Sequence, residues 1–228
     1  MTDVALEVVD DPARACAERL AAQARAGGSI VLTGGSAPRR AYEIAAELEP
    51  DWSSADVWWG DERCVPPDDE RSNYLLAKRS LLDRLEDLPE IHRMRGELDP
   101  AAAAEEYEAE LDGVEIELLL LGMGSDGHVA SLFPGSPQLQ VRDRRVTCGP
   151  SGLEPFVDRV TLTLPALLSA QETWLLITGE AKAEMVARVL RGPITEDVPA
   201  SLLRRGEGNI TVFLDHAAAS RILVPESG

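Results

Sequence analysis

Residues 118–128 of this chain read Leu-Leu-Leu-Leu-Gly-Met-Gly-Ser-Asp-Gly-His. Four consecutive leucines leave no polar face, which is typical of a central strand buried on both sides of a sheet. The glycines that follow allow the chain to turn sharply at the carboxyl end of this strand. The stretch therefore predicts a mostly parallel sheet, with a loop at the edge where open α/β sheets bind their ligands.

The rest of the chain repeats this alternation of a short apolar run with an amphipathic segment. Apolar runs predict strands at residues 29–33, 55–60, 115–121, 173–178 and 209–214. Apolar residues at three- and four-residue steps predict helices at 12–26, 38–48, 73–85, 100–111 and 181–190. Two runs at 146–148 and 157–164, close together with turns rich in Gly and Pro between them, predict a small additional antiparallel sheet. We expect one α/β domain over residues 1–228, with a modified doubly wound sheet and helices on both faces.

The formal net charge of the chain is −18. Such a surface repels polyanions, so we expect no binding to nucleic acid or to a membrane, and a small anionic substrate would need a locally basic site. The amino terminus lacks the pattern of a signal peptide and no apolar run has membrane-spanning length, which predicts a cytoplasmic protein. Cys16, Cys64 and Cys148 are widely spaced and predict neither a disulfide framework nor a zinc knuckle.

The glycine-rich loop carries His128, one of three histidines in the chain. Its letters match G-x-G-x-x-G, but Pro134, Gly135 and Pro137 would end the long helix that a dinucleotide site requires. The loop instead predicts a general base, with Asp126 holding the imidazole in one tautomer. No second histidine or cysteine lies at metal-ligand spacing, so we expect no metal, and no G-x-S-x-G motif supplies a serine nucleophile. Water is the expected nucleophile.

Two further segments follow predicted strands and have features of anion sites. Gly34 and Gly35 can adopt positive φ and expose backbone N–H groups, and Ser36 is a natural N-cap for the next helix. Residues 61–63 are expected to point toward the same rim, where Arg63 can clamp a phosphate and Asp61 can orient it or a sugar hydroxyl. The ordinary alternatives are a capped strand-to-helix connection and a solvated cluster of charges.

Lys182, one of two lysines, falls in the first turn of a predicted helix. A lysine there opposes the helix dipole slightly, and an anion bound at the helix start would remove that penalty. We favour a phosphate contact for Lys182 over a merely solvated side chain. For His92 and His216 we favour the ordinary interpretation, a histidine satisfied by a hydrogen bond.

Taken together, these segments resemble the 6-phosphogluconolactonases, within a wider group that includes the glucosamine-6-phosphate deaminases. The resemblance spans nearly the whole chain and rests on Gly34-Gly-Ser, Asp61-Glu-Arg-Cys-Val-Pro with Ser72-Asn-Tyr, Gly122-Met-Gly-Ser-Asp-Gly-His-Val-Ala-Ser-Leu-Phe-Pro-Gly, Arg159-Val-Thr-Leu-Thr-Leu-Pro and Thr178-Gly-Glu-Ala-Lys. It implies hydrolysis of 6-phospho-D-glucono-1,5-lactone to 6-phosphogluconate in the oxidative pentose phosphate pathway, without metal or organic cofactor.

The resemblance also implies roles for single residues. His128 would activate water with the support of Asp126, and Arg63, Lys182 and the backbone of residues 34–36 would bind the phosphate. The chain departs from the family pattern at Ala37 and Val129, where the family often has threonine, and it lacks a histidine that the family often carries near residues 68 and 69. These departures put one hydroxyl contact to the phosphate in doubt and leave more of the acid-base work to His128.

Two alternatives remain at this point. An amino-sugar-phosphate deaminase or isomerase would use a carboxylate such as Asp61 to abstract a proton, although deaminases typically continue toward Asn-Glu-Pro after the histidine and have an aromatic residue near the place of Arg63. A non-catalytic sugar-phosphate sensor would keep the anion site without the chemistry, but usually adds a DNA-binding helix pair and a basic face. The sequence is compatible with either a monomer or a homodimer.

Overall fold

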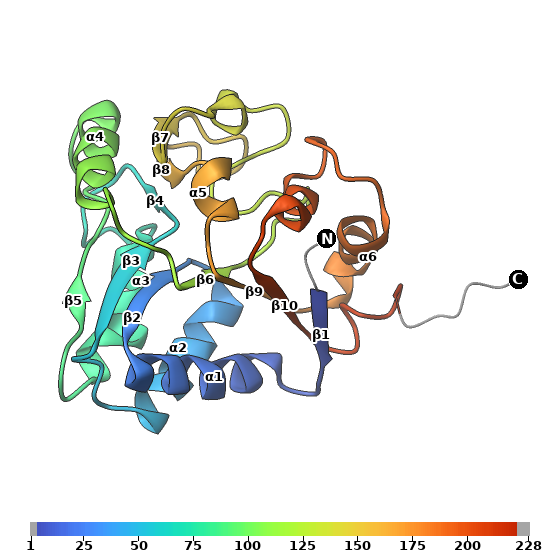
Figure 1. Cartoon of the computed structure of the whole chain (residues 1–228), viewed down its shortest axis with the longest axis horizontal. Coiled ribbons are helices and arrows are strands. Elements are labelled where there is room, and N and C mark those ends of the chain that lie inside the picture. Colours follow the sequence, from blue (N-terminus) through green and yellow to red (C-terminus); the bar gives the residue numbers. More distant parts are fainter. Residues whose placement is uncertain (1–3, 223–228) are drawn as a thin grey trace, which may run out of the picture.

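Within residues 4–222, which the computed structural model describes, seven parallel strands form one sheet (Figure 1). They are β1 (Val4–Val8), β2 (Gly28–Leu32), β3 (Ala55–Trp59), β5 (Glu90–Ile91), β6 (Leu118–Leu121), β9 (Glu172–Ile177) and β10 (Asn209–Leu214). Their order is β1-β10-β9-β6-β2-β3-β5. After β2 the chain adds β3 and β5 toward one edge of the sheet. It then returns to β6, on the other side of β2, and adds β9 and β10 toward the opposite edge. The boundary between β2 and β6 is therefore the switch point of the sheet.

Helices cover both faces of this sheet (Figure 1). One face packs against α1 (Pro12–Ala26), α2 (Ser36–Leu48) and α3 (Asn73–Ser80), and the other against α4 (Pro100–Glu110), α5 (Leu164–Leu168) and α6 (Ala183–Arg191). The leucine run of β6 shows how the sequence serves both cores: Leu118 and Leu120 enter the first, while Leu119 and Leu121 enter the second.

A second, three-stranded antiparallel sheet has the order β4-β8-β7. Its strands are β4 (Asp61–Arg63), β7 (Val146–Gly149) and β8 (Arg159–Leu162). The carbonyl of Gly60, directly after β3, accepts a hydrogen bond from Leu162 N at 2.8 Å and so joins the two sheets. Val146, Val160 and Leu162 pack into the same core as α4. The expected fold class, including the small antiparallel sheet, is confirmed.

Several predicted boundaries are wrong. The helix predicted at 73–85 ends at Ser80, because Leu81 leaves the helical region (φ −127°, ψ −72°) and a separate 3-10 turn, Leu82–Arg84, follows. The strand predicted at 115–121 begins at Leu118, and α6 is preceded by a 3-10 turn, Glu180–Lys182. The strand β1 has no counterpart in the predictions, since it lies at the sheet edge with exposed side chains and lacks a continuous apolar run.

None of the helices in residues 4–222 combines the length and the apolar character that crossing a membrane requires. The three cysteines are unpaired, with Cys16 buried and the other two half-buried.

Candidate active site

A cavity of about 320 Å³ opens at the carboxyl ends of β2, β3, β6 and β9, on both sides of the switch point. Seven of the eight site residues proposed from the sequence line it: Gly34, Gly35, Ser36, Asp61, Arg63, His128 and Lys182. The eighth, Asp126, contacts His128 without lining the cavity. A wider, open depression at residues 165–171 and 205–209 lies by the amino end of β10, the end opposite to where open sheets bind ligands.

His128 is held by a short contact to Asp126. Its Nδ1 lies 2.6 Å from Asp126 Oδ1, and the same oxygen accepts the backbone N–H of His128 at 3.2 Å. With a proton on Nδ1 donated to the carboxylate, Nε2 carries the lone pair that a general base needs. Burial alone would raise the pKa of Asp126, but the hydrogen bond and the charge of His128 outweigh it, and the pKa is lowered.

The glycine-rich loop has little room for side chains around this pair. A Cβ on Gly124 would lie 2.1 Å from His128 Nδ1 and 2.4 Å from Asp126 Oδ1. Gly124 N donates to His128 O at 2.9 Å, and Ala200 N donates to Gly127 O at 2.8 Å. These bonds hold the backbone of the loop that carries His128. The element that follows this loop is a short 3-10 turn, Pro137–Gln140, and not the long helix that a dinucleotide site requires. This agrees with the expectation from Pro134 and Pro137.

The segment after β2 forms a backbone wall of the cavity, although two details of its prediction are wrong. Gly35 has φ +117°, but Gly34 is not at positive φ. Gly34 is instead required by close approach, since a Cβ there would lie 2.0 Å from Asn73 Oδ1. Ser36 is the first residue of α2 and makes no side-chain capping hydrogen bond, because Gly35 occupies the cap position.

Two cations reach the cavity from opposite sides. Lys182 closes the 3-10 turn before α6 and forms no ion pair within residues 4–222. Burial lowers the pKa of its ammonium group, and the charge of Asp126 offsets part of that effect. Arg63, on β4, donates from Nη1 to the carbonyl of Arg71 and pairs across the sheet with Arg159. A strongly acidic protein thus has a locally positive cavity.

Asp61 lines the cavity, and both of its carboxylate oxygens accept hydrogen bonds from neighbouring side chains. Ser131 Oγ donates to its Oδ2 at 2.6 Å, and Asn73 Nδ2 contacts its Oδ1 at 3.2 Å. The residue is 7% exposed. These contacts connect the segment after β3 to the glycine-rich loop and to the start of α3.

Glu62 does not point toward the cavity rim, so that prediction is wrong. Side chains alternate along a strand, and Glu62 therefore faces away from the cavity that Asp61 and Arg63 line. It is 2% exposed and accepts four hydrogen bonds, from the backbone N–H groups of residues 63, 73 and 74 and from Ser72 Oγ. Burial raises the pKa of Glu62, while these four bonds act in the opposite direction. Glu62 therefore has a structural role, because it accepts the free backbone N–H groups at the start of α3.

Asn73 and Ala130 also line the cavity and were not proposed from the sequence. Asn73 is 2% exposed, and its Oδ1 is buried without a hydrogen-bond partner among residues 4–222. Ala130 has φ +49°, an uncommon conformation for a residue with a side chain. The sequence signal for Asn73 was the Ser72-Asn-Tyr motif, part of the family resemblance, whereas nothing in the sequence marks the backbone of Ala130.

Two buried tyrosines hold the strand ends beneath the cavity. Tyr42 Oη accepts from Thr33 N at 2.9 Å and donates to Thr33 O at 2.7 Å. Tyr107 Oη makes the same pair of contacts with Trp59, at 2.8 and 3.1 Å. Burial raises the pKa of both phenols, so they remain neutral. One tyrosine lies on each face of the sheet, and together they anchor β2 and β3 where the site begins.

Comparison with known proteins places this arrangement in a family. Residues 2–212 match the family model for glucosamine-6-phosphate isomerases and 6-phosphogluconolactonases. The chain belongs to this family. A 6-phosphogluconolactonase of Streptomyces coelicolor is 38% identical over 221 residues, covering 87% of this chain and 83% of the relative. The structure of 6-phosphogluconolactonase from Trypanosoma cruzi superposes with a TM-score of 0.83 at 30% identity, covering 98% of this chain and 99% of that one.

The family fold does not by itself separate lactonase from deaminase. A monomeric glucosamine-6-phosphate deaminase also superposes with a TM-score of 0.84, covering 96% of this chain and 100% of the deaminase, but at 22% identity. That likeness shows the fold alone. The distinction between the two activities depends on the relatives that are similar in sequence and on the chemistry of the cavity.

Proposed function

We propose a mechanism for the activity that goes with this chain's place in its family, the hydrolysis of 6-phospho-D-glucono-1,5-lactone to 6-phosphogluconate. The substrate phosphate binds between the backbone of residues 34–36 and the cations of Arg63 and Lys182. This placement holds C1 of the lactone beside His128, which converts a bimolecular encounter into an oriented reaction.

His128 Nε2 takes a proton from water as the water oxygen attacks C1. The imidazolium that forms is stabilised by Asp126 at 2.6 Å. When the tetrahedral intermediate collapses, the C1–O5 bond breaks and His128 returns its proton to the departing ring oxygen. The product forms as the carboxylic acid, which loses its proton to solvent to give 6-phosphogluconate, and the enzyme ends in its starting protonation state. The observation that carries this mechanism is the contact of Asp126 with His128, which lines a cavity together with two cations.

Asp61 is a poor candidate for the proton-abstracting base of a deaminase. Both of its oxygens already accept hydrogen bonds, from Ser131 Oγ and Asn73 Nδ2, and the side chain is buried, so neither oxygen is free to approach a substrate C–H bond. The cavity therefore favours lactone hydrolysis over the alternative. Ammonia release from glucosamine 6-phosphate would favour the deaminase, and ligand binding without turnover would favour a sensor.

The test compares lactone hydrolysis with and without enzyme, because the lactone also opens spontaneously. We expect wild-type protein to exceed the spontaneous rate at low lactone concentration, and His128→Ala to lower kcat by about a hundredfold or more. Circular dichroism of the variant controls for folding. Near-native hydrolysis by a folded His128→Ala protein would remove His128 as the base. The cytoplasmic location and the choice between monomer and homodimer stay predictions.

A further inference from the structure

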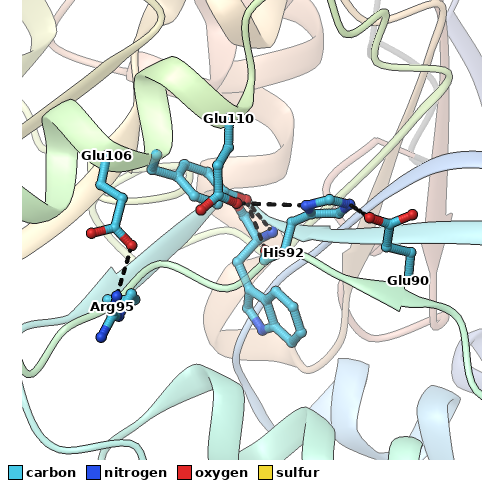
Figure 2. A network of polar contacts seen from close by, with 7 residues as sticks. Glu90, His92, Arg95, Glu106 and Glu110 are labelled. Atoms are coloured by element: carbon cyan, nitrogen blue, oxygen red, sulfur yellow. Dashed lines mark hydrogen bonds and ion pairs between the residues drawn. The ribbon is translucent and has the colours of Figure 1, made fainter.

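His92 lies between the carboxylates of Glu90 and Glu110 (Figure 2). It directly follows β5, the edge strand of the sheet, and does not line the cavity. Its Nε2 is 3.6 Å from Glu90 Oε1, and its Nδ1 is 3.5 Å from Glu110 Oε2. Asp56 comes from the neighbouring strand β3. Asp56, Glu90 and His92 each offer one ligand atom, and these atoms all lie within 4.8 Å of one another. In residues 4–222 no other group of His, Cys, Asp and Glu side chains has this property.

The parallel pairing of β3 with β5 creates this group from distant parts of the sequence. Asp56 is the register partner of Glu90, and His92 follows two residues later on the same face. Two carboxylates directly opposite each other repel. In the described part of the chain, no lysine or arginine forms an ion pair with Asp56, Glu90 or Glu110. This edge therefore carries uncompensated negative charge around one imidazole.

The imidazole has a fixed orientation. It stacks on the indole of Trp58, with ring centroids 3.8 Å apart and planes within 6°. This orientation directs one ring nitrogen toward Glu90 and the other toward Glu110. A metal-bound histidine has this arrangement, in which one nitrogen binds the ion and the other donates its N–H to a carboxylate. Glu110 is the last residue of α4, so the negative end of the helix dipole also favours a cation here.

We propose that Asp56, Glu90 and His92 bind a divalent transition-metal ion of the zinc class, with Glu110 as the positioning acceptor for His92. Nitrogen and oxygen ligands about 2.1 Å from a tetrahedral zinc ion are roughly 3.4 Å apart, close to the 3.6 Å between His92 Nε2 and Glu90 Oε1. The ligand atoms now lie up to 4.8 Å apart, and rotation of the Glu90 and Asp56 side chains would bring their oxygens to ligand distance from the same ion. The imidazole ligand selects against Mg²⁺ and Ca²⁺, which prefer oxygen.

The site is separate from the catalytic cavity. Asp56 and Glu90 lie near the amino ends of their strands, whereas the cavity lies at the carboxyl ends, and none of the three ligands lines it. A bound ion would cross-link the two-residue strand β5 to β3. Its effect is therefore on the stability of this edge, with lactone hydrolysis at saturating substrate unchanged.

The experiment titrates metal-stripped full-length protein with ZnCl₂ by calorimetry and follows the Tm in parallel. We expect wild-type protein to bind an ion that raises Tm, with MgCl₂ giving no comparable shift. His92→Phe, which keeps a ring on Trp58, should lose this ion and its Tm shift, and Glu90→Gln should weaken binding at least tenfold.

Glu110→Gln should weaken zinc binding about ten- to a hundredfold through the imidazole. The matched control is Glu106→Gln, one turn earlier on α4, because Glu106 pairs with Arg95 in the adjoining part of the network (Figure 2) and should have no effect.

All titrations are repeated in a His128→Ala background, which removes the catalytic imidazole as a second zinc ligand. Co²⁺ substitution separates the proposed site from the cysteines, since a thiolate charge-transfer band would place the ion elsewhere. Zinc affinity that His92→Phe and Glu90→Gln leave unchanged would overturn the proposal. So would the absence of any zinc-dependent Tm shift in wild-type protein.

Discussion

Replacing Asp126 with asparagine tests the part of the mechanism that depends most directly on geometry. Asp126 Oδ1 is 2.6 Å from His128 Nδ1. Two unit charges whose centres are about 4 Å apart, as in a carboxylate and an imidazolium in contact, attract by about 4 kcal/mol at an effective dielectric constant of 20. The two side chains are 23% and 29% exposed, so solvent screens part of this attraction. A charge-assisted hydrogen bond is worth about 1.5–3 kcal/mol, which predicts a loss in kcat of about 10- to 150-fold.

Asparagine has a second effect in the same direction. Its amide can donate to His128 Nδ1, which places the imidazole proton on Nε2 and removes the lone pair that accepts the proton from water. The assay is the enzymatic rate of lactone hydrolysis at saturating substrate, after subtraction of the spontaneous rate. Asp10→Asn is the matched control, because Asp10 forms a similar contact with the exposed His216, 3.4 Å away and outside the cavity.

The two residues should act as one unit. In a His128→Ala background, Asp126→Asn should cause little further loss, because the group that it supports is already absent. An equal loss in both backgrounds would mean that Asp126 acts independently of His128. An unchanged kcat in the single variant would refute the reasoning outright.

Three further predictions follow from the same structure. Gly124→Ala should lower kcat severely with little change in KM, since its Cβ would lie 2.1 Å from His128 Nδ1; steady-state kinetics checks this. Lys182→Met should lower kcat/KM for the phosphorylated lactone about tenfold or more, but leave hydrolysis of unphosphorylated gluconolactone unchanged. Arg93 lowers the pKa of Glu97 to about 2, a shift equivalent to at most about 3 kcal/mol and to about 1 after screening. Glu97→Gln should therefore reduce stability in urea at pH 7, and the difference from wild type should vanish as pH falls from about 4.5 toward 2.

The periodicity of the sequence was sufficient for the large elements and missed several of the short ones. Helices over residues 12–26 and 100–110 were predicted almost to the residue, because Pro12 and Pro100 begin them and apolar spacing runs through them. The strands β4 and β5 have three and two residues, too few for any pattern to be recognised. They form because neighbouring strands, β8 and β3, supply their hydrogen-bond partners.

The same division holds for the candidate site. Motifs at strand ends predicted His128, Asp126, Arg63 and Lys182 as parts of one candidate site. The structure places them at one edge, because an open parallel sheet brings the ends of its strands together whatever their separation in sequence. The orientation of Glu62 was predicted wrongly because the strand β4 was not predicted. Side chains alternate along this strand, so Glu62 faces away from the cavity. Asn73 was missed as a site residue because its contact with Gly34 and Asp61 depends on how α3 packs beside β4.

The sequence by itself determined the fold class, the carboxyl-edge location of the site and the residues that supply its charge, since apolar periodicity and motif spacing are local properties of the chain. Only the tertiary structure decided which of those residues meet. It showed that Gly34 is needed for close packing, and it gathered Asp56, Glu90 and His92 into one group. The physical reason is that strand register and side-chain burial are set by contacts between segments far apart in the chain, which a single sequence does not display.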